Sequence, residues 1–344
     1  MNWKRPLFLF SAMGALLLVG VLVSLFWGLP AEGSRFPWDA SLIAWWKGQD
    51  FAHSYPASTG ILLQLRLPRI VLAVLAGAHL ALAGLIMQSL FGNPLADPYI
   101  TGVSSGAALG AVIAFCLKWD SSLWGLNSVS FLAFSGAMGV ACLVYAMARK
   151  GSALSLSHLL LTGICISALA QAVTTFLLFS AENQQLRSAL HWLFGSLAYR
   201  DWGYVRGLLA YTVIGVISAF AFHWHLDLLA MGEEGAHHLG IRLGHTKTLL
   251  LMIASLLAAS TVAACGIIGF VGLIIPHAMR ALFGASHRIL IPACVVGGAL
   301  LLVLSDLVAR VALSGQEIPI GMVTSVIGSL FFLILLLRSP GGVR

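Results

Sequence analysis

The sequence has few charged residues for its length. Of its 344 residues, 9% are Asp, Glu, Lys or Arg, whereas 59% are apolar. A soluble domain carries roughly a quarter charged residues, which excludes a soluble enzyme and a disordered chain. Together with a mean hydropathy of +0.95, this predicts an all-α polytopic membrane protein.

Basic clusters and cysteine pairs are also missing. The net charge of +7 comes from 19 basic and 12 acidic residues, and no basic run exceeds two residues. A nucleic-acid partner is therefore not indicated, because its binding face needs clustered Lys and Arg. The five cysteines lie in apolar stretches without a CxxC pair, which predicts small core residues and excludes a secreted disulfide scaffold.

The chain contains no G-x-x-x-x-G-K-[ST] loop, so we do not expect it to hydrolyse ATP itself. The run from Gly102 to Gly106 matches G-x-S-x-G, the nucleophile elbow of serine hydrolases. That motif needs a strand-to-helix turn, whereas here it opens an apolar helix. We therefore interpret Gly102, Gly106 and Gly110 as a small-residue face for helix packing, with an intramembrane hydrolase as the weaker alternative.

Long stretches without charge define the predicted spans. A membrane-spanning helix needs about 20 apolar residues. Nine stretches of at least 17 residues lack Asp, Glu, Lys and Arg: 6–31, 70–96, 98–117, 121–148, 151–181, 207–226, 248–279, 289–305 and 318–337. The stretch 248–279 is too long for one helix and holds Gly266, Gly269, Gly272 and Pro276, so we expect two helices there. The prediction is ten spans, with both termini on one side and 6–31 as an uncleaved first span.

Basic residues do not settle the orientation. With the N-terminus inside, ten of the 19 basic residues fall on the inner side and nine on the outer side, so the positive-inside rule gives no clear answer. The apolar piece Ser188–Tyr199 is too short to span and is expected to lie at the interface or re-enter the membrane. The outer arginines call for an explanation other than topology.

The stretch 151–181 is the most polar span. Gly163, Ser167, Gln171 and Thr174 recur at helical spacing on one face, which indicates either a translocation path or hydrogen bonding between helices. No Asp or Glu lies in the middle of a span, which disfavours a proton-coupled transporter. His79 is interpreted as a hydrogen-bonded packing residue or, less favourably, as a polar contact near the path.

The segment 223–247 is a polar break between spans. Its apolar residues recur every three or four positions, which predicts a short amphipathic helical pair suited to docking on a partner. The segment also holds five histidines. Without cysteines or a fixed ligand spacing, they do not define a metal site, and we predict none.

Several long motifs occur in a fixed order. They are LRLPR (65–69), GAHLALAGLIMQ (77–88), NPLADP (93–98), GVSSGAALGA (102–111), LLAMGE (228–233), GIIGFVGLIIPHAMR (266–280), SDLVAR (305–310) and EIPIGMVTSVIGSLFF (317–332). This set resembles the permease subunits of bacterial type II ABC importers, the FecCD/vitamin B12 permease family, which handles iron-siderophores, haem and cobalamin. The resemblance covers nearly the whole chain from residue 60 onward.

The resemblance implies one transmembrane permease domain over residues 1–344, with ten spans, in the bacterial inner membrane. It further implies a homodimer with a path along its two-fold axis, two ATP-binding cassette subunits and a periplasmic binding protein. ATP and Mg would bind to the partner ATPase, while this chain would bind no cofactor and would not be an enzyme. An iron chelate, such as a siderophore or haem, is the expected substrate; cobalamin import and, less favourably, ion-coupled secondary transport are the alternatives.

The resemblance also assigns roles to residues. The outer arginines of the family match Arg66, Arg69 and Arg310, which would pair with glutamates of the binding protein; lipid-headgroup contact is the alternative. Coupling helices match residues 226–244, where the ATPase contacts would be Gly232, Glu233, Glu234, Ala236, Leu239 and Gly240. The cytoplasmic gate matches Asn93, Leu95, Leu156 and Ser157, and the translocation path would include Ser167, Gln171 and Thr174.

Overall fold

The computed structural model describes residues 4–26, 60–119, 122–123, 126–150, 153–232, 243–313 and 316–338. Its long helices are α1 (Lys4–Phe26), α5 (Leu67–Phe91), α7 (Ser128–Ala148), α8 (Leu156–Phe179), α10 (Trp202–Ala221), α13 (Leu243–Cys265), α15 (His287–Val311) and α16 (Ile320–Arg338). Shorter helices are α6 (Val103–Cys116), α9 (Asn183–Leu193), α11 (His223–Ala230) and α14 (Val271–Phe283), with single turns η1 (Ile61–Arg66) and η2 (Pro98–Thr101). Within these ranges the strands form two small antiparallel hairpins, β1 (Ser122–Leu123) with β2 (Leu126–Asn127) and β3 (Arg149–Lys150) with β4 (Ala153–Leu154).

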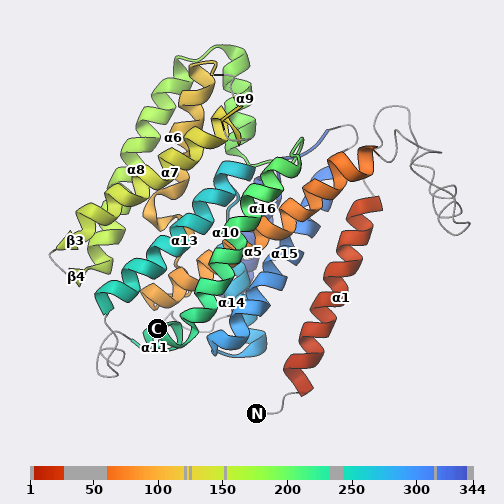
Figure 1. Ribbon diagram of the computed structural model, residues 1–344, viewed down its shortest axis with the longest axis vertical. Coiled ribbons are helices and arrows are strands. Elements are labelled where there is room, and N and C mark those ends of the chain that lie inside the picture. Colours follow the sequence, from red (N-terminus) through yellow and green to blue (C-terminus); the bar gives the residue numbers. More distant parts are fainter. Residues whose placement is uncertain are drawn as a thin grey trace, which may run out of the picture.

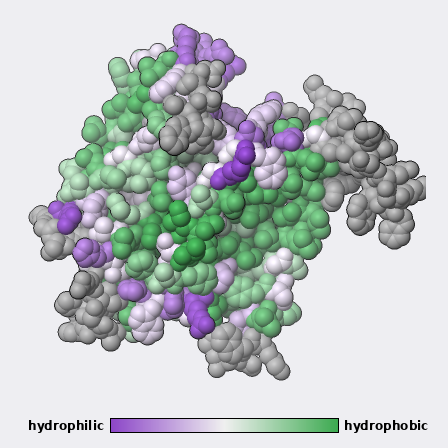
Figure 2. Space-filling model, in the orientation of Figure 1, coloured by the Kyte–Doolittle hydropathy of each residue, from purple (hydrophilic) through white to green (hydrophobic). Residues whose placement is uncertain are grey.

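The described helices agree with the predicted spans. Eight of them are long and apolar enough to cross a membrane, and α6 and α14 are shorter apolar helices. Together they account for the ten predicted spans. In Figure 2, hydrophobic residues cover the middle of the visible face and hydrophilic residues gather towards its two ends, as a bilayer requires.

One helix lies at the centre of the bundle. In its most apolar window, α5 with η1 has 89% of its residues buried, against 17% for α1 and 22% for α8. Helices α10, α13, α14 and α15 pack around α5, whereas α6, α7 and α8 form a separate group beside them (Figure 1). The apolar surfaces of α1 and α8 remain exposed on the single chain, where lipid or another subunit can cover them.

The predicted split of the stretch 248–279 is confirmed. Helix α13 ends at Cys265 and α14 begins at Val271. The chain turns at Gly266 and Phe270, both of which have positive φ. Two of the four residues cited for the split have other roles: Gly272 packs against Gly84 of α5, and Pro276 lies inside α14.

Helix α9 is too short to span a membrane, as predicted for the region 188–199, but it begins and ends earlier. The carboxylate of Glu182 and the side chain of Gln185 form a capping box that starts the helix at Asn183. Residues 194–200 form an irregular connection with turns instead of continuing the helix.

The prediction that the cysteines are core residues is partly wrong. Cys265 and Cys294 are buried, whereas Cys142 and Cys165 are exposed on the surface of the single chain, and all five are free thiols. Both exposed cysteines lie within spanning helices, so they face lipid or a second subunit.

The bundle has two ends, which we name after their short helices (Figure 1). The α9 end holds α9 and the start of α5. The α11 end holds α11 and the start of α1. Helix α5 runs from one end to the other, and each end carries one group of candidate functional residues.

The predicted small-residue face of α6 is confirmed as a packing surface. A Cβ atom at Gly110 would overlap the carbonyl of Leu132 on α7, and one at Gly106 would overlap that of Gly136. Ser105 donates a hydrogen bond to the carbonyl of Gly102 at 2.9 Å. The G-x-S-x-G run therefore opens a helix that packs through its glycines, and no strand precedes it in the described chain.

We predict that Gly110→Leu separates α6 from α7 and lowers the midpoint of thermal unfolding by several degrees. Gly139→Leu on the exposed face of α7 is the matched control, because nothing lies within 4 Å of its added Cβ. Both variants would be purified in the same detergent and heated in parallel. Equal midpoints for the two variants would contradict the packing role of the glycine face.

Candidate functional site: the two ends of the bundle

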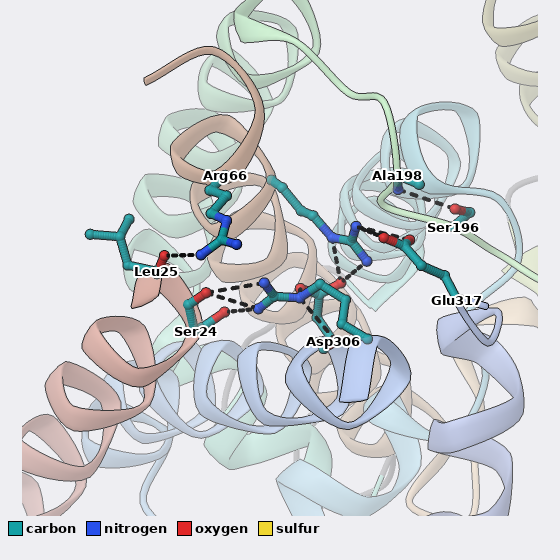
Figure 3. A network of polar contacts seen from close by, with 9 residues as sticks. Ser24, Leu25, Arg66, Ser196, Ala198, Asp306 and Glu317 are labelled. Atoms are coloured by element: carbon teal, nitrogen blue, oxygen red, sulfur yellow. Dashed lines mark hydrogen bonds and ion pairs between the residues drawn. The ribbon is translucent and has the colours of Figure 1, made fainter. Parts of the chain in front are cut away.

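A buried carboxylate organises the arginines at the α9 end (Figure 3). Asp306 on α15 is 1% exposed. It accepts a hydrogen bond from Arg69 Nε at 2.8 Å. Arg310, one turn later on α15, places its Nε 3.1 Å from the other carboxylate oxygen. Two cations from two helices therefore share one buried anion.

The same arginines bind neighbouring segments. Arg69 forms a forked pair with both oxygens of Glu317 at 2.9–3.0 Å, which attaches the segment before α16. Arg310 donates to the backbone carbonyl of Ser24 on α1 at 3.1 Å, and Arg66 donates to that of Leu25 at 2.9 Å. The cluster joins α1, α5, α15 and the start of α16.

These contacts bear on the predicted docking residues. Arg310 is 5% exposed, so pairing it with a second protein would first require breaking its pair with Asp306. Arg69 has a carboxylate partner of its own but lies next to the half-exposed Glu317. Arg66 makes a backbone contact and is partly exposed. Arg310 is the most enclosed of the three, and a partner of Arg69 would have to share it with Asp306 and Glu317.

A second polar network lies at the α11 end. The backbone N–H and the Nδ1 atom of His287, at the start of α15, lie 2.8 and 2.7 Å from one carboxylate oxygen of Asp227 on α11. His287 Nε2 lies 2.6 Å from the hydroxyl of Ser89 on α5. This order resembles a Ser-His-Asp triad, but Ser89 is 1% exposed, so a substrate cannot reach it. The network connects α11, α15 and α5.

The residue before Ser89 extends this network to α14. The amide nitrogen of Gln88 lies 3.2–3.3 Å from the carbonyls of Gly272 and Leu273, and its oxygen accepts a bond from Arg280 at 2.9 Å. The last turn of α5 is therefore fixed to three helices immediately before it leads into the predicted gate loop.

The gate loop is folded around its own side chains. Gly92 ends α5 in the left-handed conformation, and Asn93 accepts a bond from the backbone N–H of Leu95 at 2.9 Å. Asp97 caps η2 through the N–H of Tyr99, and burial raises the pKa of Asp97 to about 6. Asn93 and Leu95 are exposed on the single chain.

The other predicted gate residues begin α8. Ser155 caps this helix by accepting a bond from the backbone N–H of His158 at 3.4 Å. Leu156 follows partly buried, and Ser157 is exposed. The four predicted gate residues thus lie at the α11 end, and three of them are exposed.

The predicted polar face of α8 divides into two parts. Gly163 is buried against the backbone of Ile100, and Ser167 lies beside Gly102. Thr174 is buried but donates its hydroxyl to Ala170 in its own helix at 2.7 Å. Gln171 is exposed on the outer surface of the chain, where only lipid or a second subunit could meet it.

His79 lies in a closed polar cluster between helices. Its Nε2 atom is 2.6 Å from the hydroxyl of Thr212 on α10, and its Nδ1 atom is 3.2 Å from that of Thr261 on α13. The side chain is fully buried, which supports the packing interpretation. Within the described ranges, no group of three or more His, Cys, Asp or Glu is arranged to hold a metal ion.

Comparison with known proteins identifies the family. Residues 16–338 match the model of the FecCD transport family. The chain belongs to this family. It is 41% identical to the cobalamin import system permease protein BtuC of Halobacterium salinarum, over 90% of this chain and 81% of that one. It is 39% identical to the hemin transport system permease HmuU of Yersinia pestis, over 81% and 83%, and 38% identical to the Fe(3+) dicitrate permease FecD of Escherichia coli, over 88% and 91%.

A solved structure supports the same assignment. The fold matches an ABC transporter described as of the metal-chelate type, in an inward-facing conformation, with a TM-score of 0.82 and 31% identity over 96% of this chain and 98% of that one. The chain is therefore the permease subunit of an ABC importer, a multi-pass inner-membrane protein and not an enzyme. The alternatives of an ion-coupled transporter and a hydrolase are set aside by this family membership.

Sequence reasoning missed several residues of the two polar networks. Asp306 and Glu317 lie in the quoted motifs, but their pairing with Arg69 joins residues more than 230 positions apart. The network of Ser89, Asp227 and His287 was not predicted either. The sequence does mark these five residues in one way: each is a polar residue near the end of an apolar span.

We predict that Asp306→Ala destabilises the permease strongly, because it removes the buried carboxylate that Arg69 and Arg310 share. Breaking a buried pair in this way typically costs about 3 kcal/mol or more. The control is Lys118→Ala, which breaks the exposed pair between Lys118 and Glu182 and should change little. Thermal unfolding of the purified variants measures both; similar midpoints for the two would contradict the buried network.

Proposed function

We propose that this permease moves an iron chelate, a siderophore or haem, from a periplasmic binding protein into the cytoplasm. The observation that carries the proposal is the family match over almost the whole chain, joined to a solved transporter of the metal-chelate type. Among the relatives, one is named for hemin and one for Fe(3+) dicitrate. Cobalamin is the second candidate, favoured by the 41% identity to a cobalamin permease.

The working unit in this proposal is a homodimer with two ATP-binding cassette subunits. Each chain contributes one transmembrane domain, residues 1–344, and ATP and Mg bind to the partner ATPase because this chain has no phosphate-binding loop. The exposed gate residues Asn93, Leu95 and Ser157 support a gate completed by a second copy. The path then runs between the copies, where the exposed Gln171 could line it with Ser167 and Thr174.

The α11 end faces the cytoplasm in this arrangement. The coupling segment 226–244 begins in α11, and the ATPase contacts proposed for it start at Gly232, whose φ is +111°. The remaining contacts, Glu233, Glu234, Ala236, Leu239 and Gly240, lie outside the described residues. At the opposite, periplasmic end, Arg66 and Arg69 are proposed to bind acidic residues of the binding protein. The proposed part of Arg310 is to hold Asp306, the carboxylate that also binds Arg69.

The first test is uptake in a strain from which this chain has been deleted. Labelled ferric siderophore, haem and cyanocobalamin are supplied in turn, with and without the restored permease. We expect restoration for an iron chelate only. Restoration for cyanocobalamin alone would replace the proposed substrate, and transport that survives ATP depletion would contradict the importer mechanism.

We further predict that Asp227→Ala uncouples the complex. The proposed reason is that Asp227 fixes α11 to His287 and, through Ser89, to the helix that carries the gate loop. Uptake should fall several-fold while ATP hydrolysis by the purified complex persists. His223→Ala in the first turn of the same helix is the control, because within the described chain His223 bonds the nearby carbonyl of Phe220. An equal loss in both variants would contradict a specific link.

A further inference from the structure

A pocket with a cavity volume of about 600 Å³ opens at the α9 end. It lies between α9, the end of α6, the start of α7 and residues 196–204. Its size falls within the range of small-molecule sites, roughly 300–1,000 Å³. None of the roles assigned above uses this pocket.

Three basic side chains are among the described lining residues of the pocket. Arg187 and His191 lie one turn apart on α9, and Arg200 comes from the connection to α10. Within the part of the chain that the structure describes, neither Asp nor Glu lines the pocket, and no ion pair there involves Arg187 or Arg200. The uncompensated charge favours an anionic occupant.

Arg200 is held in place with hydrogen-bonding capacity to spare. Its guanidinium donates to the hydroxyl of Tyr204 at 3.0 Å and lies 4.7 Å from the centre of that ring. Its Nε–H is buried and has no hydrogen-bond partner. A buried donor without an acceptor is costly, so an anion that reached it would relieve that cost.

The wall that carries Arg200 is rigid. The backbone N–H of Ser196 donates to the carbonyl of Cys265 at 2.8 Å, and the N–H of Ile320 donates to that of Gly195 at 3.1 Å. These bonds fix residues 194–200 against the ends of α13 and α16. A preformed wall reduces the ordering cost of binding a ligand.

We propose that this pocket is an entry site that receives the carboxylate groups of an anionic metal chelate before it passes into the path. The inference rests on the proposed function, because the α9 end faces the periplasm only in that orientation. Guanidinium groups bind carboxylates through forked hydrogen bonds. The tyrosines and Trp192 of the lining would contact the apolar or aromatic part of the chelate.

This site distinguishes the candidate substrates by charge. Haem carries two propionates and ferric dicitrate carries free carboxylates, whereas the charges of cyanocobalamin cancel. A lipid phosphate could satisfy the same arginines, and the experiment separates it from a chelate.

The test measures binding to the full-length permease in nanodiscs of zwitterionic lipid. Haemin, ferric dicitrate and cyanocobalamin are titrated into the wild type, Arg187→Gln and Arg187→Lys. For Arg187→Gln we expect about a tenfold weaker affinity for the two anionic chelates, the usual effect of losing one charge-assisted hydrogen bond, and no change for cyanocobalamin. Arg187→Lys should retain most of the affinity, and added salt should weaken binding of the wild type.

Arg206→Gln is the matched control, since Arg206 is an exposed arginine at the same end but outside the pocket. Equal effects of Arg187→Gln and Arg206→Gln, no effect of Arg187→Gln, or an equal effect on cyanocobalamin would overturn the proposal. We expect that adding phosphatidylglycerol to the nanodiscs does not displace the bound chelates. If phosphatidylglycerol occupies the pocket and the chelates do not compete with it, the site is a lipid site and the proposal is wrong.

Failure of this inference can be told apart from failure of the proposed function. If the restored permease imports an iron chelate in cells but Arg187→Gln leaves binding unchanged, only the entry site is wrong. If the restored permease imports cyanocobalamin alone, the proposed substrate is wrong as well.

Discussion

Backbone contact between α5 and its neighbours, made through paired glycines, is the constraint on which the rest of the permease depends. Gly77 meets the carbonyl of Gly298 on α15, and Gly84 meets that of Gly272 on α14, so closely that a Cβ at either α5 glycine would overlap the neighbouring backbone. In lipid, helices gain little from burying apolar side chains against each other, so close packing and polar contacts must hold them. These glycines therefore let α5 lie at the centre of the bundle.

Polar side chains then fix the position of α5 along its axis. Arg69 binds Asp306 near one end, His79 contacts Thr212 and Thr261 in the middle, and Ser89 meets His287 near the other end. Three anchors at three depths prevent α5 from sliding or rotating against α10, α13 and α15. The gate loop follows directly after the last anchor, so its position is inherited from the whole helix.

The features that the sequence predicts well are those that depend on local composition. Apolar length predicts the ten spans, and the glycines of 266–272 predict the break between α13 and α14, because a membrane imposes its thickness on every span. The early start of α9 at Asn183 was missed because it depends on a capping box at Glu182 and Gln185. The i, i+4 spacing of Asp306 and Arg310 is consistent with their pair, but nothing local to either residue reveals that Ser24 and Arg69 lie beside them, so the motif positions could be assigned roles only by resemblance.

The pocket at the α9 end could not be predicted for a related reason. Arg187 and Arg200 are separated by a helix end and an irregular connection, so no helical periodicity relates them. Their charges also appear unremarkable in a count of ten inner against nine outer basic residues. Only the folding of residues 194–200 against α13 brings them to one cavity.

The interrupted helix pair α13–α14 touches both ends of the molecule. Irregular backbone within a membrane must have its polar groups satisfied by protein, and here the carbonyl of Cys265 accepts from Ser196 in the pocket wall, while that of Ile268 accepts from the hydroxyl of Tyr99 in η2. The bond to Cys265 holds the wall of the pocket, and the bond to Ile268 holds η2, the segment that follows the gate loop. Cys265 is the last residue of α13 and Ile268 lies in the five-residue break that follows it, so neighbouring parts of the chain make the two bonds. The end of α13 and the break that follows it therefore hold the pocket wall and η2 in a fixed relation, through backbone carbonyls three residues apart.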